Sequence, residues 1–114
     1  MHEVSLLESL IEQVQEIGAR EKFTKVLEIR LSVGALSGVD PSCLEFCYSE
    51  VISGSILDGA RLVLERVGLE LRCENCGEVS KPTDSSALFC EMCSSGQVRI
   101  LRGREFKIVD LEVA

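Results

Sequence analysis

Two C-x-x-C motifs constrain the fold of this chain more than any other feature of its sequence. Cys73 and Cys76 form the first pair, Cys90 and Cys93 form the second, and thirteen residues separate the pairs. The surrounding segment, roughly residues 69–101, has few large apolar side chains, and about thirty residues of such composition cannot bury a sufficient core. Two residues between the cysteines of a pair allow both thiolates to face one metal ion. We therefore predict a zinc ribbon held by a tetrahedral four-sulfur site.

A four-sulfur zinc site is closed, because it leaves no position for water or substrate. The predicted site is therefore structural and not catalytic. The alternatives are two disulfides, a thioredoxin-like redox pair, or an iron centre with the same four ligands. Disulfides conflict with the lack of an export signal, and neither pair lies in a βαβ context, so iron is the main competitor.

The overall composition disfavours several functional classes. Twelve basic against nineteen acidic residues give a net charge of −7, which argues against a nucleic-acid partner. No apolar run approaches the length that spans a bilayer, and the start of the chain does not look like a signal peptide. We therefore expect a cytoplasmic protein without membrane insertion. The single histidine, His2, excludes the usual zinc-protease and three-histidine motifs, so we expect no enzymatic activity.

Hydrophobic periodicity predicts five elements outside the ribbon and an α+β fold class. Apolar residues at every third or fourth position predict a first, amphipathic helix that ends at Gly18. Asp40 followed by Pro41 predicts the N-cap and first position of a second helix. Alternating apolar and polar residues predict the strands. The predicted elements are helices over residues 4–18 and 41–53, and strands over residues 27–33, 60–67 and from about 102 to the end.

The N-terminal sequence Met1-His2-Glu3 offers nitrogen donors that suit a divalent metal ion. The terminal amine, the His2 amide nitrogen and the His2 ring nitrogen can close adjacent chelate rings, and the Glu3 amide or carboxylate can add a ligand. Ni(II) and Cu(II) prefer such nearly planar nitrogen coordination. The amine and the imidazole must lose protons to bind, so acid should release the ion. The alternative interpretation is a solvated histidine at a frayed terminus.

Together these features resemble the HypA/HybF family of hydrogenase nickel-incorporation metallochaperones. The similar segments are Met1-His2-Glu3 before an amphipathic helix, Val33-Gly34-Ala35-Leu36-Ser37-Gly38-Val39, and Cys73-Glu74-Asn75-Cys76-Gly77, and the order of elements also agrees. The similarity covers essentially the whole chain. It implies a nickel-binding domain of two helices and a three-stranded sheet, formed by residues 1–68 and 102–114. It also implies an inserted zinc-ribbon domain, residues 69–101.

The resemblance further implies metal ligands and partners. As a family member, the chain would carry Ni(II) as transferred cargo to the large subunit of a [NiFe] hydrogenase, together with a nickel-incorporation GTPase. Asp40 is a weaker nickel candidate, because capping the second helix already explains an Asp before Pro41. Open sheet edges leave a homodimer as a further expectation. The implied ligands are Met1, His2 and Glu3 for nickel, and Cys73, Cys76, Cys90 and Cys93 for zinc.

Two details of the cysteine-containing segments also carry expectations. Cys43 and Cys47 share one face of the second helix and are expected to be small core residues, although such a pair can also hold a soft metal ion. In the second knuckle Ser94 follows Cys93, where relatives frequently have Gly, so we expect a less rigid turn.

Two competing functions fit the same motifs. The first is a zinc-ribbon adaptor that binds protein or nucleic acid and transfers no nickel. The second is a thiol-disulfide oxidoreductase that uses one C-x-x-C pair. Nickel uptake by zinc-loaded protein would favour the nickel carrier over the adaptor. Tightly held zinc would exclude the oxidoreductase, since metal-bound thiolates cannot pass through a redox cycle.

Overall fold

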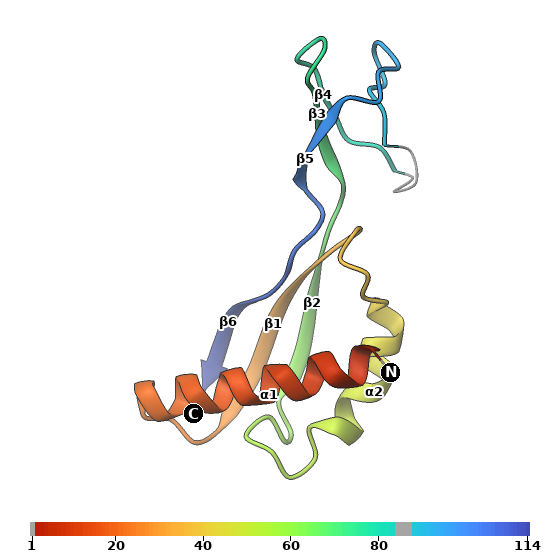
Figure 1. Cartoon of the computed structure of the whole chain (residues 1–114). Coiled ribbons are helices and arrows are strands. Elements are labelled where there is room, and N and C mark those ends of the chain that lie inside the picture. Colours follow the sequence, from red (N-terminus) through yellow and green to blue (C-terminus); the bar gives the residue numbers. More distant parts are fainter. Residues whose placement is uncertain (1, 84–87) are drawn as a thin grey trace. The chain divides into compact units, whose positions relative to one another are not determined.

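The computed structural model describes residues 2–83 and 88–114, except for the side chain of His2. Figure 1 shows two helices and a three-stranded sheet, with three shorter strands between β2 and β6. The α+β class is confirmed. The elements are α1 (His2–Glu21), β1 (Val26–Gly34), α2 (Pro41–Val51), β2 (Arg61–Val67), β3 (Glu70–Cys73), β4 (Val79–Ser80), β5 (Val98–Arg102) and β6 (Phe106–Val113).

The larger sheet has the strand order β2-β1-β6, and α1 crosses one of its faces (Figure 1). Leu7 and Val14 of α1, Ile29 and Leu31 of β1, and Leu44 of α2 are fully buried. The alternating residues of β1 and the three-to-four spacing in α1 thus supply one aliphatic core. The core also holds α1 against α2, which places the start of α1 beside the start of α2.

The first helix is longer than predicted, and Gly18 does not end it. Helix α1 continues to Glu21, and Lys22 takes the left-handed conformation with φ 63°. The Phe23 N–H then donates to the Gly18 carbonyl over 3.0 Å, which completes a Schellman cap. The prediction that the helix stops at Gly18 was wrong. Glycine is needed there for close packing, because a Cβ would lie 2.9 Å from the Phe23 carbonyl oxygen.

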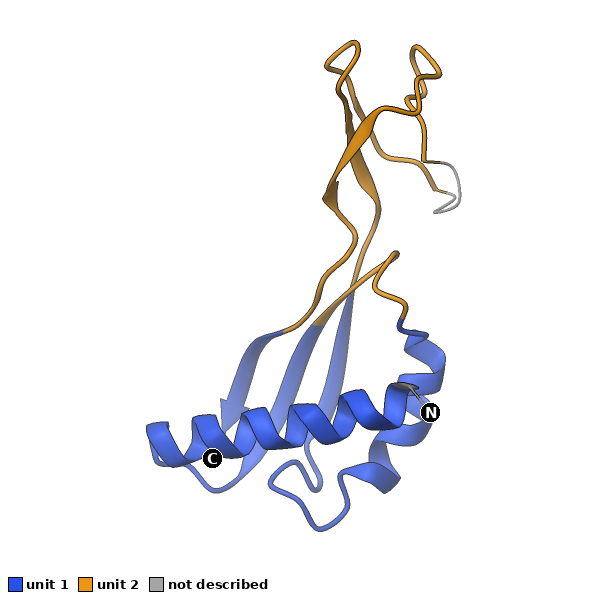
Figure 2. Cartoon of the chain, in the orientation of Figure 1, with its two compact units in different colours: residues 1–31, 39–65, 108–114 blue, residues 32–38, 66–107 orange. Residues whose placement is uncertain are grey.

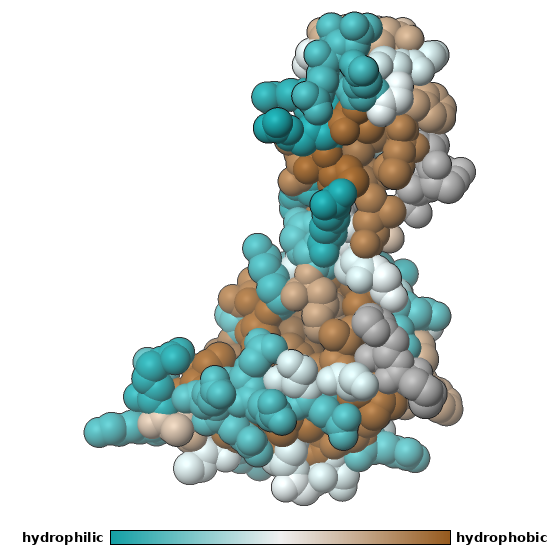
Figure 3. Space-filling view, viewed as in Figure 1, coloured by the Kyte–Doolittle hydropathy of each residue, from teal (hydrophilic) through white to brown (hydrophobic). Residues whose placement is uncertain are grey.

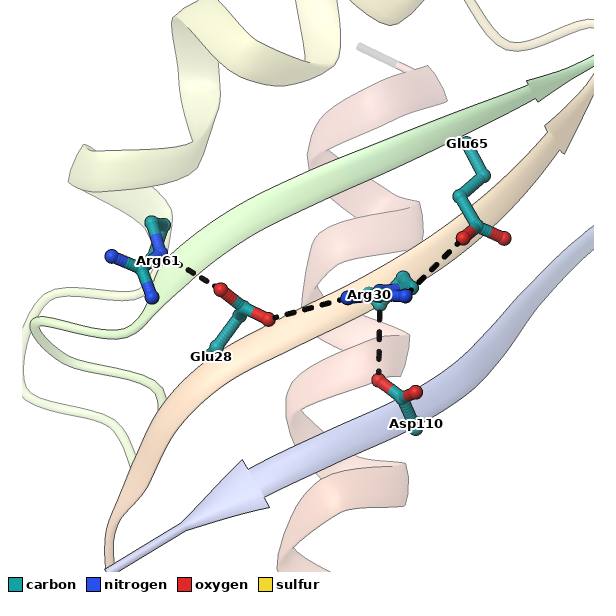
Figure 4. Close-up of polar contacts among 5 residues, drawn as sticks. All are labelled: Glu28, Arg30, Arg61, Glu65 and Asp110. Atoms are coloured by element: carbon teal, nitrogen blue, oxygen red, sulfur yellow. Dashed lines mark hydrogen bonds and ion pairs between the residues drawn. The ribbon is translucent and has the colours of Figure 1, made fainter.

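The sheet face opposite α1 carries an ion-pair network (Figure 4). The Arg30 guanidinium lies 3.5 Å from Glu65, 3.7 Å from Glu28 and 3.8 Å from Asp110. Arg61 donates to Glu28 over 2.8 Å. In Figure 4, β1 and β2 run in the same direction and β6 runs in the opposite direction, so the network links all three strands. Exposed ion pairs stabilise weakly, by about 0–1 kcal/mol each, and this face is therefore polar without being a major source of stability.

The smaller sheet has the strand order β4-β3-β5 and is antiparallel. Strand β3 pairs Leu71 with Ser80 of β4 and with Ile100 of β5. A register shift follows Glu70, at the start of β3. Leu71 is fully buried, and β3 ends at Cys73, the first residue of the cysteine cluster. The smaller sheet thus presents the first C-x-x-C motif from a paired strand.

The chain divides into two compact units (Figure 2). One comprises residues 1–31, 39–65 and 108–114, and the other residues 32–38 and 66–107. In the second unit the Gly34 N–H donates to Glu105 over 2.7 Å, and a Cβ on Gly34 would lie 2.2 Å from the Gly103 oxygen. Only glycine fits that close backbone approach. The domain boundaries expected from the sequence, 1–68 with 102–114 and 69–101, remain a prediction.

Apolar side chains reach the surface of both units (Figure 3). The most exposed are Phe46 on α2, at 86%, and Met92 in the second cysteine motif, at 73%. Within residues 2–83 and 88–114, neither helix combines the length and the apolar character that crossing a bilayer requires.

Candidate metal centres

The structure brings the four ribbon cysteines together. Their sulfur atoms all lie within 4.8 Å of one another. Two close separations join the two motifs: Cys73 to Cys93 and Cys76 to Cys90 are both 3.6 Å apart. Each sulfur is therefore in contact with a sulfur of the other C-x-x-C pair, as in a four-ligand cage around one ion.

The two knuckles position their sulfurs with the same backbone hydrogen bonds. The N–H groups of Asn75 and Cys76 donate to the Cys73 sulfur, each over 3.3 Å. The N–H groups of Met92 and Cys93 donate to the Cys90 sulfur, each over 3.4 Å. These donors favour the negatively charged thiolate, the form that ligates a metal ion.

Each knuckle closes with a residue in the left-handed conformation. Gly77 has φ 82°, and its N–H donates to the Cys73 carbonyl over 2.9 Å. Ser94 has φ 65°, and its N–H makes the equivalent 2.9 Å bond to Cys90. Ser94 thus adopts the turn in which glycine is usual, at the steric cost of a side chain.

The electrostatics of the cluster favour a cation at its centre. The N–H of Cys76, with that of Asn75, lowers the pKa of the Cys73 thiol to about 6, although burial opposes the shift. The N–H of Cys93 lowers the pKa of Cys90 in the same way. For Cys76 the Glu78 N–H acts to lower the pKa, but burial and the three neighbouring sulfurs raise it to about 12. A thiolate at Cys76 therefore needs a positive charge nearby. A four-sulfur set fits zinc or iron and offers no open position.

Glu3, one of the predicted nickel ligands, is held in place by contacts with the start of α2. Glu3 lies in the first turn of α1 and is only 8% exposed. Its carboxylate accepts the backbone N–H of Asp40 over 3.2 Å, and this bond is the largest cause of its lowered pKa. The Cys43 thiol also shares a hydrogen bond with this carboxylate. The third residue of the chain is thus attached to the N-terminus of α2.

Asp40 acts as the N-cap of α2, as predicted. Its carboxylate Oδ1 accepts the N–H groups of Ser42 over 3.0 Å and Cys43 over 3.4 Å. Pro41 occupies the first helical position, where a missing N–H costs nothing. The capping bonds account for the Asp40 side chain without a metal ion. Met1 and the side chain of His2 lie outside the described residues, so the predicted nickel ligands remain a prediction.

Cys43 and Cys47 are half-buried and not core residues, contrary to expectation. The core side of α2 is formed instead by Leu44 and Tyr48, and the Tyr48 hydroxyl donates to the Ala60 carbonyl over 3.0 Å. The contact of Cys43 with Glu3 was not predicted either. It joins residues 40 positions apart, and only the packing of α1 on α2 reveals it.

Comparisons with known proteins point to one family. A family model described as hydrogenase/urease nickel incorporation, metallochaperone, HypA, matches residues 1–113. The hydrogenase maturation factor HypA of Rhizobium leguminosarum bv. viciae is 40% identical over 113 residues, 99% of each chain. That of Nitrosospira multiformis is 35% identical over 113 residues, 99% of this chain and 97% of the relative. The solution structure of the Ni metallochaperone HypA from Helicobacter pylori aligns with a TM-score of 0.70 at 28% identity, over 97% of this chain and 96% of that one.

Proposed function

Because this chain belongs to the HypA family of hydrogenase/urease nickel-incorporation metallochaperones, we propose that it binds one Ni(II) ion reversibly and delivers it to the large subunit of a [NiFe] hydrogenase. The ion is cargo and not a resident cofactor. Such a carrier has no reaction to catalyse, so its chemistry consists of ligand exchange at an accessible site.

In this proposal the nickel ligands are the Met1 amine, the backbone and ring nitrogens of His2, and Glu3. The attachment of Glu3 to the Asp40 amide supports the proposal most directly. A buried, hydrogen-bonded carboxylate at the third residue anchors the backbone next to the proposed donors and lowers the entropy lost when they close around an ion. Nitrogen donors that must lose protons make release sensitive to acid.

The four ribbon cysteines, in the same proposal, hold a permanent structural Zn(II). Thiolates retain zinc, whereas the terminal nitrogen donors exchange nickel, so the two ions are sorted by ligand type. The ribbon, residues 69–101, would be an inserted domain that folds with its metal. The nickel domain would comprise residues 1–68 and 102–114. A nickel-incorporation GTPase is the proposed partner in delivery, and a homodimer and a cytoplasmic location remain part of the proposal.

Isothermal titration of zinc-loaded protein with Ni(II) tests the proposal. The chain without any N-terminal addition should bind one nickel ion, and His2→Ala should lose at least about tenfold in affinity, since a ligand is removed. Adding two residues before Met1 should have the same effect, because the backbone amine is displaced. Zinc content and helical circular dichroism should not change in either variant.

The matched control is Gln13→Ala, at an exposed position of α1 where the side-chain amide donates to Ser9 of the same helix. It should bind nickel as the unmodified chain does. Full nickel affinity in both His2→Ala and the extended chain would overturn the proposal. The zinc-ribbon adaptor that transfers no nickel would then be the better interpretation.

A further inference from the structure

The half-buried cysteines of α2 form a sulfur pair that supplies no ligand to either proposed metal centre. Cys43 and Cys47 are four residues apart in one helix, so their side chains lie one above the other on the same face. Leu44 and Tyr48 fill the core side of α2, and the sulfur pair lies at the border between core and solvent. The pair is therefore reachable by a small ion, which a fully buried pair would not be.

The contacts of the pair place both sulfur atoms together. The Cys43 thiol has two polar neighbours, the Cys47 thiol and the Glu3 carboxylate. Burial is the largest cause of the raised pKa of Cys43, and these two neighbours add to it. Cys43 is also the third residue of α2, in the first turn, where the helix dipole favours added negative charge.

We propose that Cys43 and Cys47 form a two-sulfur site for a soft monovalent metal ion, Cu(I). Soft thiolate ligands favour Cu(I), zinc and iron–sulfur clusters, and of these Cu(I) is the one that two sulfurs can hold. Over residues 2–83 and 88–114, the only group of three or more His, Cys, Asp or Glu ligand atoms within 4.8 Å of one another is the ribbon cluster. Among these residues, α2 therefore lacks the four ligands that Zn(II) requires.

The binding step balances without a redox partner. Two thiol protons leave to solvent as two S–Cu bonds form, and the copper remains Cu(I) throughout. The product carries one net negative charge, from two thiolates and one monovalent cation. It forms next to the Glu3 carboxylate, and the N-terminal turn of α2 compensates part of the repulsion. The site does not depend on the proposed nickel function.

The test is an anaerobic Cu(I) titration of the full-length, zinc-loaded chain, with bicinchoninate as the competing chelator. We expect one copper per chain with zinc fully retained. Cys43→Ser and Cys47→Ser should each weaken binding at least about 100-fold, because one sulfur cannot hold the ion. Helical circular dichroism of each variant shows whether α2 has folded, and copper-edge X-ray absorption should report sulfur neighbours alone.

Two controls separate this site from the others. Cys47→Ser combined with Ser49→Cys keeps six thiols but moves one off the shared face, and should lose the copper. His2→Ala should retain it, so failure of the nickel proposal leaves this one intact. Tight copper in folded Cys43→Ser and Cys47→Ser, or displacement of zinc by copper in the unmodified chain, would overturn the inference.

Discussion

Substitutions of Asp40 separate its capping role from a role in nickel binding. Asp40→Ala removes the acceptor for the Ser42 and Cys43 N–H groups. The loss of an N-cap costs about 1 kcal/mol, and the 3.4 Å length of the second bond argues against a larger value. In a domain of this size that corresponds to a fall of about 4 °C in melting temperature. Asp40→Asn keeps an oxygen acceptor in the same place, so its stability should match that of the unmodified chain.

Nickel affinity gives the second measurement on the same two variants. The Asp40 backbone N–H that holds Glu3 survives both substitutions, because it belongs to the main chain. Asp40→Asn should therefore change nickel affinity by less than about fivefold, the effect of one exposed charge. Urea denaturation followed at 222 nm and nickel titration of zinc-loaded protein supply the data. Two results would refute the capping explanation. One is a loss of stability in Asp40→Asn equal to that in Asp40→Ala, and the other is a loss of nickel affinity beyond about tenfold in Asp40→Asn.

Two other outcomes follow from particular contacts. Gly34→Ala should destabilise the chain by about 1–3 kcal/mol in thermal unfolding, since its Cβ meets the Gly103 backbone, whereas Gly96→Ala, with open space around it, should be neutral. Cys73→Ser should release zinc and abolish the ribbon signals in an amide NMR spectrum while the signals of α1 and α2 remain; loss of every folded signal would show that the two domains are not separable.

Hydrophobic periodicity predicted the elements whose stability depends on the aliphatic core. Helices α1 and α2 and strands β1, β2 and β6 all lie where the sequence pattern placed them, within a few residues. The short strands β3, β4 and β5 were not predicted individually, because the ribbon has few apolar side chains to produce a pattern. The spacing of the cysteines instead predicted that their sulfurs would meet.

Local sequence could not predict features that depend on long-range packing. The Schellman cap at Lys22 and the glycine packing at Gly18 depend on where Phe23 folds back. The joining of Glu3, Asp40 and Cys43 depends on α1 packing against α2. The left-handed turn at Ser94 depends on the knuckle around it, which imposes the conformation on a residue that disfavours it.

The position of β6 in the larger sheet has a consequence for the order in which the chain folds. Strand β6 pairs with β1, although β2 and the whole smaller sheet intervene in the sequence. Closing so long a loop is entropically costly, and the cost becomes smaller as the free part of the chain becomes shorter. A metal-bound ribbon already joins β3 to β5, after which only residues 103–105 precede β6. Metal supply to the cysteines should therefore accelerate completion of a sheet that contains none of them.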